Sequence, residues 1–273
     1  MPTINVGGLE MYYEMEGAGA PVVFISGLSG DHLAWAMQVP AVAAAGYRCL
    51  VFDSRDTGQT AQSPTPYTIR QLADDTAGLM EALGLSRAHI VGASMGGMIA
   101  QEIALHYPER VSSLTLVCTG TSVDPVTAGI LRAWRAQRPH GSPEDFVLSL
   151  SAWIFTYRFY QQIDAVQGFL QMVGGNPFPQ TAAGFQRQCD AVLSHDTERR
   201  VGSITAPTHV IVGAEDNLTP PRHARALAGQ IAGATLTEIP AAGHGLFWEQ
   251  AEAFNTAVLQ FLNGQPAGAA ASV

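Results

Sequence analysis

The sequence has 273 residues, 47% of them hydrophobic, so the chain can bury a substantial core without disulfides or structural metals. Its net charge of −9 argues against nucleic acid as a partner, because phosphate binding requires a basic surface. All 14 basic residues are arginines, and the lack of lysine excludes Schiff-base chemistry, Ser–Lys dyads and lysine-dependent phosphate or pyridoxal sites.

Neither a metal motif nor a membrane segment is visible in the sequence. H-E-x-x-H and paired Cys/His spacings are absent, and no apolar run reaches about 18 residues. We therefore expect no metal, no cofactor and no membrane contact. Cys49, Cys118 and Cys189 are widely separated, which is typical of buried thiols in a reducing compartment. The first residues lack the features of a signal peptide, so the cytoplasm is the expected location.

The chain begins with a predicted hairpin. Residues 3–6 and 9–14 flank Gly7-Gly8, a pair that tolerates the positive φ of a tight turn. The second segment alternates apolar and polar residues, which is typical of an edge strand with one solvated face.

Short apolar runs follow, and they do not alternate, as expected of strands buried on both faces. They occur at residues 22–25, 49–52, 89–91, 114–117 and 210–212. Helical patterns separate most of these runs, including residues 69–83, where Thr68 and Gln71 make a capping box. Residues 247–262 predict a last amphipathic helix. Alternating strands and helices indicate an α/β fold, a mostly parallel sheet with helices on both faces.

The stretch 121–200 interrupts this rhythm, because strand patterns disappear and most of the aromatic residues of the chain gather there. We interpret it as a helical cap lying over the carboxyl edge of the sheet, where open α/β sheets bind ligands. The predicted division is a core of residues 1–120 and 201–263, a cap of 121–200 and a disordered tail of 264–273. Many cap aromatics should pack the cap onto the core, and the predicted substrate-binding residues are Trp134, Trp153, Tyr157 and Phe178.

The motif Gly92-Ala-Ser94-Met-Gly96 is the most informative part of the sequence. It matches G-x-S-x-G and lies directly after a predicted strand and before a predicted helix. A nucleophilic serine needs such a strained strand-to-helix turn, and the flanking glycines leave room for it. A small residue in an ordinary glycine-rich turn is the alternative interpretation of Ser94.

A serine nucleophile needs a base, and the base needs an acid that orients it. Asp216 follows a buried strand, and His244 lies between two glycines before the last helix, which gives the order Ser, acid, His. Glu215 is the alternative acid. The other histidines lie in or beside regular elements, or, as for His195 and His223, are predicted at the surface.

Two backbone N–H groups are candidates for an oxyanion hole. Met95 follows the nucleophile at a helix N-terminus, where negative charge is stabilised. Leu28 lies in the loop after the first parallel strand, where Gly27 lets the backbone turn inward. An ordinary strand-to-helix turn is the alternative for this second loop.

Together these residues resemble the α/β-hydrolase superfamily over nearly the whole chain. Within it, Gly-Ala-Ser-Met-Gly-Gly-Met-Ile-Ala-Gln and the pattern from Pro66 to Gly84 resemble the 3-oxoadipate enol-lactonase and carboxylesterase branch. The segment Arg55-Asp-Thr-Gly58 is similar to polyketide methylesterases, and we interpret it as a structural turn network. Ser26 stands where many relatives have His, which leaves the backbone donor intact.

The resemblance implies a serine hydrolase that cleaves a small hydrophobic or aromatic ester or lactone through an acyl-Ser94 intermediate. An enol-lactone diacid would need an arginine near the pocket, and Arg135, Arg158 and Arg187 are candidates. A C–C bond hydrolase acting on a vinylogous diketone is an alternative. Ala93 argues against it, because such enzymes usually carry Asn before the nucleophile. A small-molecule receptor without turnover, built on the same fold, is another alternative.

Overall fold

The protein, represented by a computed structural model described for residues 2–265, is built on a sheet of eight strands. Their spatial order is β1-β2-β4-β3-β5-β6-β7-β8, antiparallel at β1–β2 and β2–β4 and parallel at every other pair. The bounds are β1 (Thr3–Val6), β2 (Leu9–Gly17), β3 (Ala20–Ile25), β4 (Tyr47–Phe52), β5 (Ala88–Ala93), β6 (Val111–Val117), β7 (Thr208–Gly213) and β8 (Thr235–Ile239). The predicted hairpin and all five predicted parallel strands are present. Residues 266–273 of the predicted tail lie outside the described residues.

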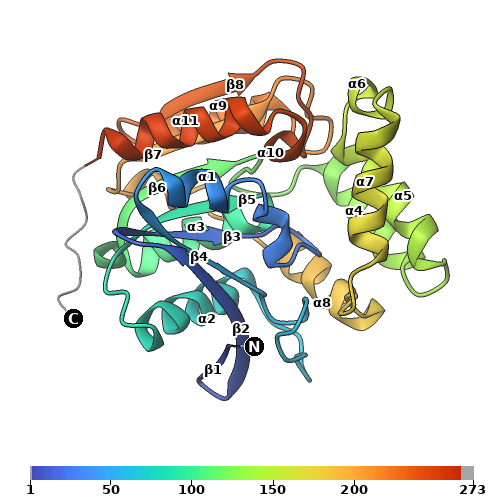
Figure 1. Cartoon of the computed structure of the whole chain (residues 1–273), viewed down its shortest axis with the longest axis horizontal. Coiled ribbons are helices and arrows are strands. Elements are labelled where there is room, and N and C mark those ends of the chain that lie inside the picture. The colour runs from blue at the N-terminus through green and yellow to red at the C-terminus, as the bar shows by residue number, and fades with distance from the viewer. Residues whose placement is uncertain (1, 266–273) are drawn as a thin grey trace.

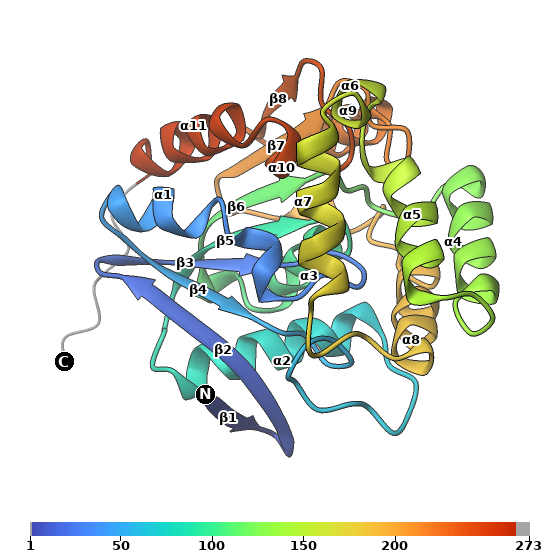
Figure 2. The ribbon, with the colours of Figure 1, turned by 45° about the vertical axis from the view of Figure 1, so that its right-hand side comes forward.

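The central strands are apolar because they are covered on both faces, and β5, β6 and β7 are buried along their whole lengths. Helices α1 and α11 pack together on one side of the sheet, and α2 packs against α3 on the other (Figures 1 and 2). The core helices are α1 (Val39–Ala44), α2 (Ile69–Ala82), α3 (Met95–His106), α9 (Pro221–Gln230), α10 (Leu246–Glu249) and α11 (Ala251–Asn263). This arrangement is the α/β-hydrolase fold that the sequence predicted.

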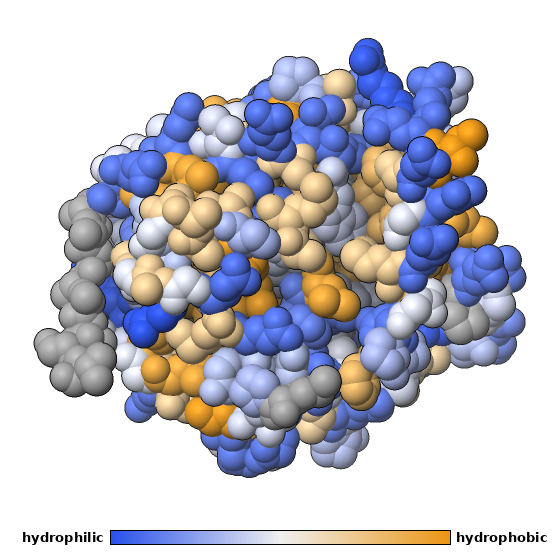
Figure 3. All heavy atoms as spheres, in the orientation of Figure 1, coloured by the Kyte–Doolittle hydropathy of each residue, from blue (hydrophilic) through white to orange (hydrophobic). Residues whose placement is uncertain are grey.

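A group of helices lies between β6 and β7 in the chain and projects to one end of the sheet (Figure 2). Its members are α4 (Pro125–Gln137), α5 (Pro143–Ile154), α6 (Tyr157–Tyr160), α7 (Ile163–Gly174) and α8 (Ala182–Leu193). We call this group the cap. On the face shown in Figure 3, apolar residues lie in the middle, interspersed with hydrophilic ones, and further apolar residues lie at its right-hand and lower-left edges. In the described part of the chain, no helix combines the length and the apolar character needed to cross a membrane.

The two connections between core and cap run side by side. Ser122 in the outgoing segment forms an antiparallel bridge with Asp196 in the returning one. The Thr197 N–H donates to the Thr121 carbonyl at 2.8 Å, and the Thr197 hydroxyl donates to Gln101 of α3 at 2.6 Å. The base of the cap is therefore fixed to the helix that begins after Ser94.

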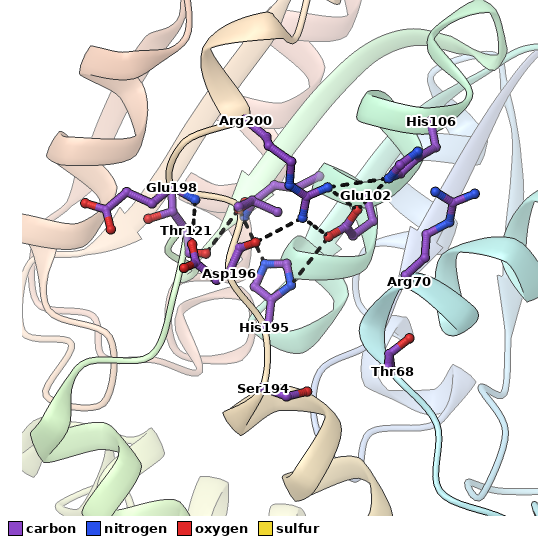
Figure 4. Close-up of polar contacts among 12 residues, drawn as sticks. Thr68, Arg70, Glu102, His106, Thr121, Ser194, His195, Asp196, Glu198 and Arg200 are labelled. Atoms are coloured by element: carbon purple, nitrogen blue, oxygen red, sulfur yellow. Dashed lines mark hydrogen bonds and ion pairs between the residues drawn. The ribbon is translucent and has the colours of Figure 1, made fainter.

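A buried carboxylate completes this attachment (Figure 4). Glu102 of α3 receives two hydrogen bonds from the Arg200 guanidinium, at 2.6 and 3.0 Å, and lies 3.2 Å from His106 Nε2 and 3.9 Å from His195 Nδ1. Burial acts to raise the pKa of Glu102, but Arg200 and the two histidines hold it below its usual value. His195, predicted at the surface, is instead buried, and burial lowers its pKa to about 4.

Candidate active site

Ser94 lies in the turn between β5 and α3 with φ 55° and ψ −117°. A left-handed φ at a residue with a side chain costs on the order of 1–3 kcal/mol, so the surroundings must hold the turn. The Ser94 N–H donates to the Val117 carbonyl at 2.8 Å, and the Thr119 hydroxyl donates to the Ser94 carbonyl at 2.9 Å. The turn places Ser94 in the wall of a pocket, where its hydroxyl can meet a ligand.

The two glycines of the motif are needed because the backbone is crowded on both sides of Ser94. A Cβ on Gly92 would clash with the Gly96 carbonyl, and a Cβ on Gly96 would clash with the Ile25 carbonyl at the end of β3. The spacing in G-x-S-x-G therefore follows from close packing of the turn, the helix and the neighbouring strand.

His244 and Asp216 are in hydrogen-bond contact. Nδ1 of His244 lies 2.9 Å from Oδ2 of Asp216, and both side chains are buried. Because a carboxylate only accepts hydrogen bonds, this contact places a proton on Nδ1 and leaves Nε2 of the neutral ring as the acceptor. His244 also lines the pocket that contains Ser94. The geometry thus suits a base at Nε2 that is oriented from behind by Asp216.

Further donors converge on Asp216. The backbone N–H groups of Leu218 and Thr219 donate to its Oδ1 at 2.9 and 2.8 Å, and the Thr219 hydroxyl donates to Oδ2 at 2.7 Å. Burial alone would raise the pKa of Asp216, but His244 and the hydrogen bonds from Thr219 lower it overall. Asp216 is therefore held as a carboxylate. Thr219 Oγ1 also lies 3.1 Å from His244 Nδ1, so this hydroxyl touches both partners.

The two predicted oxyanion donors border the same pocket as Ser94. A Cβ on Gly27 would lie 3.2 Å from the Ser94 Cβ and 3.8 Å from its Oγ, so the loop after β3 passes directly beside the serine. Neither the Leu28 N–H nor the Met95 N–H has a hydrogen-bond partner among residues 2–265. Both backbone groups can therefore donate to a ligand oxygen near Ser94.

The pocket has a volume of about 130 Å³ and is mostly apolar. Core and cap both contribute to its wall, including Leu28, Met98, Leu131, Trp134, Leu150, Ile154, Phe185, Val192, Leu218, Phe247 and Trp248. Its size and lining fit a small, largely apolar ligand.

Of the four cap aromatics predicted to bind substrate, the structure brings only Trp134 into the pocket wall. Trp153, Tyr157 and Phe178 do not line it and are 39%, 77% and 42% exposed, so the structure does not place them where the sequence predicted. They lie on the outward sides of their cap segments. Phe247 and Trp248, at the start of α10, line the pocket instead.

None of the arginines proposed for a diacid substrate lines the pocket. Arg187 pairs with Asp56 at 2.7 Å, and Arg135 pairs with Asp190 at 2.7 Å. Arg158 is exposed. The pocket wall thus offers no guanidinium to a substrate carboxylate.

Glu249 of α10 connects the cap to the loop that carries His244. One carboxylate oxygen accepts from the N–H and hydroxyl of Thr156 at 2.6 and 2.9 Å, and the other accepts from the Gly243 N–H. The Gly245 N–H also donates to the Ile154 carbonyl at the end of α5, at 2.9 Å. The loop around His244 is therefore bonded to the cap directly through Gly245, and indirectly through Gly243 and Glu249.

One group among the described residues has the composition of a metal site. Ligand atoms of Cys118, Asp216 and His244 lie within 4.8 Å of one another. Burial raises the pKa of the Cys118 thiol well above its usual value, which opposes the thiolate that binds metals. Asp216 is also already engaged by four hydrogen-bond contacts from Leu218, Thr219 and His244. The geometry suits a hydrogen-bonded Asp–His pair better than a metal centre.

Comparison with known proteins agrees with this architecture. A family model described as the alpha/beta hydrolase fold matches residues 20–251. The chain belongs to the α/β-hydrolase family. Among the relatives of this α/β hydrolase is the "Putative non-heme bromoperoxidase BpoC" of Mycobacterium tuberculosis, 35% identical over 93% of this chain and 97% of the relative. The "Putative carbamate hydrolase RutD" of a Caulobacter species is 32% identical over 98% of this chain and 100% of its own.

Solved structures of the α/β-hydrolase family are similarly close. The enol-lactonase from Burkholderia xenovorans superposes with a TM-score of 0.88 at 28% identity, over 96% of this chain and 100% of that one. The family resemblance inferred from the sequence motifs is thereby confirmed.

Two polar residues of this α/β hydrolase escaped prediction. Thr219 stands three residues after Asp216 and directly before Pro220, where a side chain can reach back to the acid, so this spacing was a usable signal. Glu249 follows His244 by five residues and joins the neighbouring Gly243 to Thr156, a cap residue 93 positions away from Glu249. No local pattern indicates such a contact.

Proposed function

We propose that this α/β hydrolase is a serine hydrolase that cleaves a carboxylic ester or lactone of a small, largely apolar molecule. Ser94 attacks the carbonyl carbon while Nε2 of His244 takes its proton, and the alcohol leaves with a proton returned by His244. His244 then activates water, which releases the acid from the acyl-Ser94 intermediate. Asp216 orients His244 and stabilises its charged form, and the Leu28 and Met95 N–H groups donate to the oxyanion.

One observation carries this proposal. Ser94, on a strained turn at the start of α3, and His244, bonded from behind by Asp216, border the same apolar pocket. A reactive hydroxyl, an oriented base and two free N–H groups beside them form the set of parts that acyl transfer requires. The proposal needs no cofactor.

The substrate class follows from the pocket wall. Apolar and aromatic side chains dominate it, and no arginine faces a ligand. An uncharged ester or lactone fits this wall better than the diacid of an enol-lactone. Relatives with names such as enol-lactonase and carbamate hydrolase support attack on a carbonyl carbon as the common step.

The test combines turnover with active-site labelling. Purified protein should hydrolyse p-nitrophenyl esters of short acids, and a fluorophosphonate should label Ser94 in a one-to-one ratio. Ser94→Ala should lower turnover by about 10³-fold or more and abolish labelling, because the covalent route is lost. Its melting temperature should stay unchanged, since alanine keeps the Cβ. Ser203→Ala, at an exposed serine, is the matched control.

Three results would contradict the proposal. Retention of more than about a tenth of the turnover in Ser94→Ala would remove Ser94 as nucleophile. Inhibition by a chelator that added metal reverses would point to a metal site at Cys118, Asp216 and His244. Labelling of Ser94 without turnover of any ester would favour the receptor or C–C hydrolase alternatives.

A further inference from the structure

The pocket has a second polar region, built from residues that play no part in the proposed triad. Asp124 and His223 both line it, although they come from different elements. Asp124 precedes α4 at the base of the cap, and His223 lies in the first turn of α9 in the core. Nε2 of His223 lies 2.8 Å from Oδ2 of Asp124.

The Asp124 carboxylate is fully occupied within the protein. It accepts from the backbone N–H groups of Val126 and Thr127 at 2.7 and 3.2 Å. The Thr127 hydroxyl lies 3.0 Å from Asp124 Oδ2 and shares its one proton with the Leu218 carbonyl at 2.8 Å. Arg222 approaches it at 3.4 Å. With His223 added, its lone pairs have no capacity left for a ligand. Asp124 therefore acts on His223 and does not itself receive a substrate group.

The contact with Asp124 determines which ring nitrogen of His223 is available. A carboxylate accepts only, so Nε2 carries a proton and Nδ1 is the remaining polar atom of the ring. Nδ1 has no hydrogen-bond partner among residues 2–265, and it does not belong to the buried, unpaired side-chain atoms of that range. Nδ1 is therefore accessible. The His223 side chain lies beside the backbone of Gly120, another residue of the pocket wall, where an added Cβ would lie 3.4 Å from the His223 Cβ and 3.8 Å from its Cγ.

We infer that His223 forms a polar subsite of this pocket that hydrogen-bonds a hydroxyl group on the substrate. Nδ1 of the neutral ring accepts a hydrogen bond, and that of the charged ring donates one. A hydroxyl serves in both cases because it donates and accepts. The inference rests on the proposed esterase function and narrows it to esters or lactones with a hydroxyl away from the scissile bond. The rest of the pocket wall combines apolar side chains, such as Leu131, Val192 and Leu218, with the hydroxyl residues Ser122, Thr127 and Thr219.

Matched pairs of esters test the subsite. Two pairs that differ only in a hydroxyl are p-nitrophenyl butanoate against 3-hydroxybutanoate, and p-nitrophenyl 3-phenylpropanoate against 3-(4-hydroxyphenyl)propanoate. Wild-type kcat/KM should favour the hydroxylated member of at least one pair by about tenfold, the scale of one hydrogen bond to a polar site. His223→Phe should remove this preference or reverse it. Arg222→Gln, which changes the other side-chain neighbour of Asp124 outside the pocket wall, should keep it.

Binding to Ser94→Ala protein, measured by calorimetry with the same pairs, separates the subsite from catalysis. A tenfold ratio of Kd that disappears in the Ser94→Ala/His223→Phe double variant supports the subsite even if no ester is turned over. In that case the esterase proposal is contradicted, while the subsite proposal is supported. Equal kcat/KM and Kd within both pairs, or a preference that survives His223→Phe, would overturn the inference while leaving the esterase proposal intact.

Discussion

Glu215 and Asp216 are neighbours in the chain, yet their carboxylates lie in opposite environments. Asp216 is 2% exposed and faces His244, whereas the Glu215 side chain is exposed, and its backbone N–H bonds to the Ala242 carbonyl. An orienting carboxylate must contact Nδ1 of the base. The positions of the two side chains therefore favour Asp216 over Glu215 as the acid.

Replacing each acid by its amide provides the corresponding experiment. Asp216→Asn should preserve the fold and lower kcat by about 10⁴-fold, because Asn can donate to Nδ1 and favour the wrong tautomer of His244. Glu215→Gln should change kcat by less than about tenfold, since it alters only an exposed charge. Steady-state kinetics and thermal melts of both variants check this. If the larger loss occurs in Glu215→Gln, the third member of the triad is Glu215.

The Thr219 hydroxyl should contribute to turnover through Asp216. Thr219→Val keeps the shape of the side chain but removes the donor to Oδ2, and it should lower kcat by about three- to thirtyfold with little change in KM. Thr219→Ser restores a hydroxyl at the same position and should recover most of kcat. A loss of the same size in both variants would mean that packing of the side chain, and not its hydroxyl, matters.

The cluster around Glu102 predicts how stability depends on pH. The folded state keeps His195 neutral down to about pH 4, whereas a solvated histidine takes up its proton near pH 6.5. Between these values the unfolded chain binds more protons, so the free energy of unfolding falls as the pH decreases. His195 should add up to about 1.4 kcal/mol per pH unit to this slope. Glu102, whose pKa is lowered, adds a further loss of stability at still lower pH.

Denaturant unfolding of the wild type and His195→Gln from pH 7 to pH 4 measures this contribution. The variant should show a shallower decrease, and His140→Gln, at an exposed position, serves as the control. Parallel curves for the wild type and His195→Gln would show that His195 takes up its proton equally in both states.

The sequence predicted the parts of the fold that depend on local patterns. β7 is visible as an apolar run because it is buried along its full length. β8, Thr235–Ile239, was not predicted, since this edge strand is only partly buried and mixes threonine and glutamate with apolar residues. The turn at Ser94 was predictable because its motif is contiguous in the chain, even though Gly96 is required by the distant Ile25 carbonyl and only Gly92 by a neighbour within the motif.

The walls of the pocket could not be predicted in the same way. Trp134 and Trp153 both lie on cap helices, and only the packing of the cap decides that the first is buried and the second exposed. His223 was expected at the surface because its partner, Asp124, is 99 positions away in the chain. Such contacts form between residues far apart in the chain, and no periodic pattern in the sequence indicates them.

The hydrogen bonds of Glu249 connect the cap to the loop that carries His244. Ile154 at the end of α5 is bonded to Gly245, and Thr156 before α6 is bonded to Glu249 of α10, shortly after the catalytic candidate His244. A replacement cap without a donor at the position of Thr156 would leave the Glu249 carboxylate bonded to Gly243 but not to the cap. An exchange of the cap in this chain therefore has to include residues 243–249, from the far end of the chain, together with the cap itself.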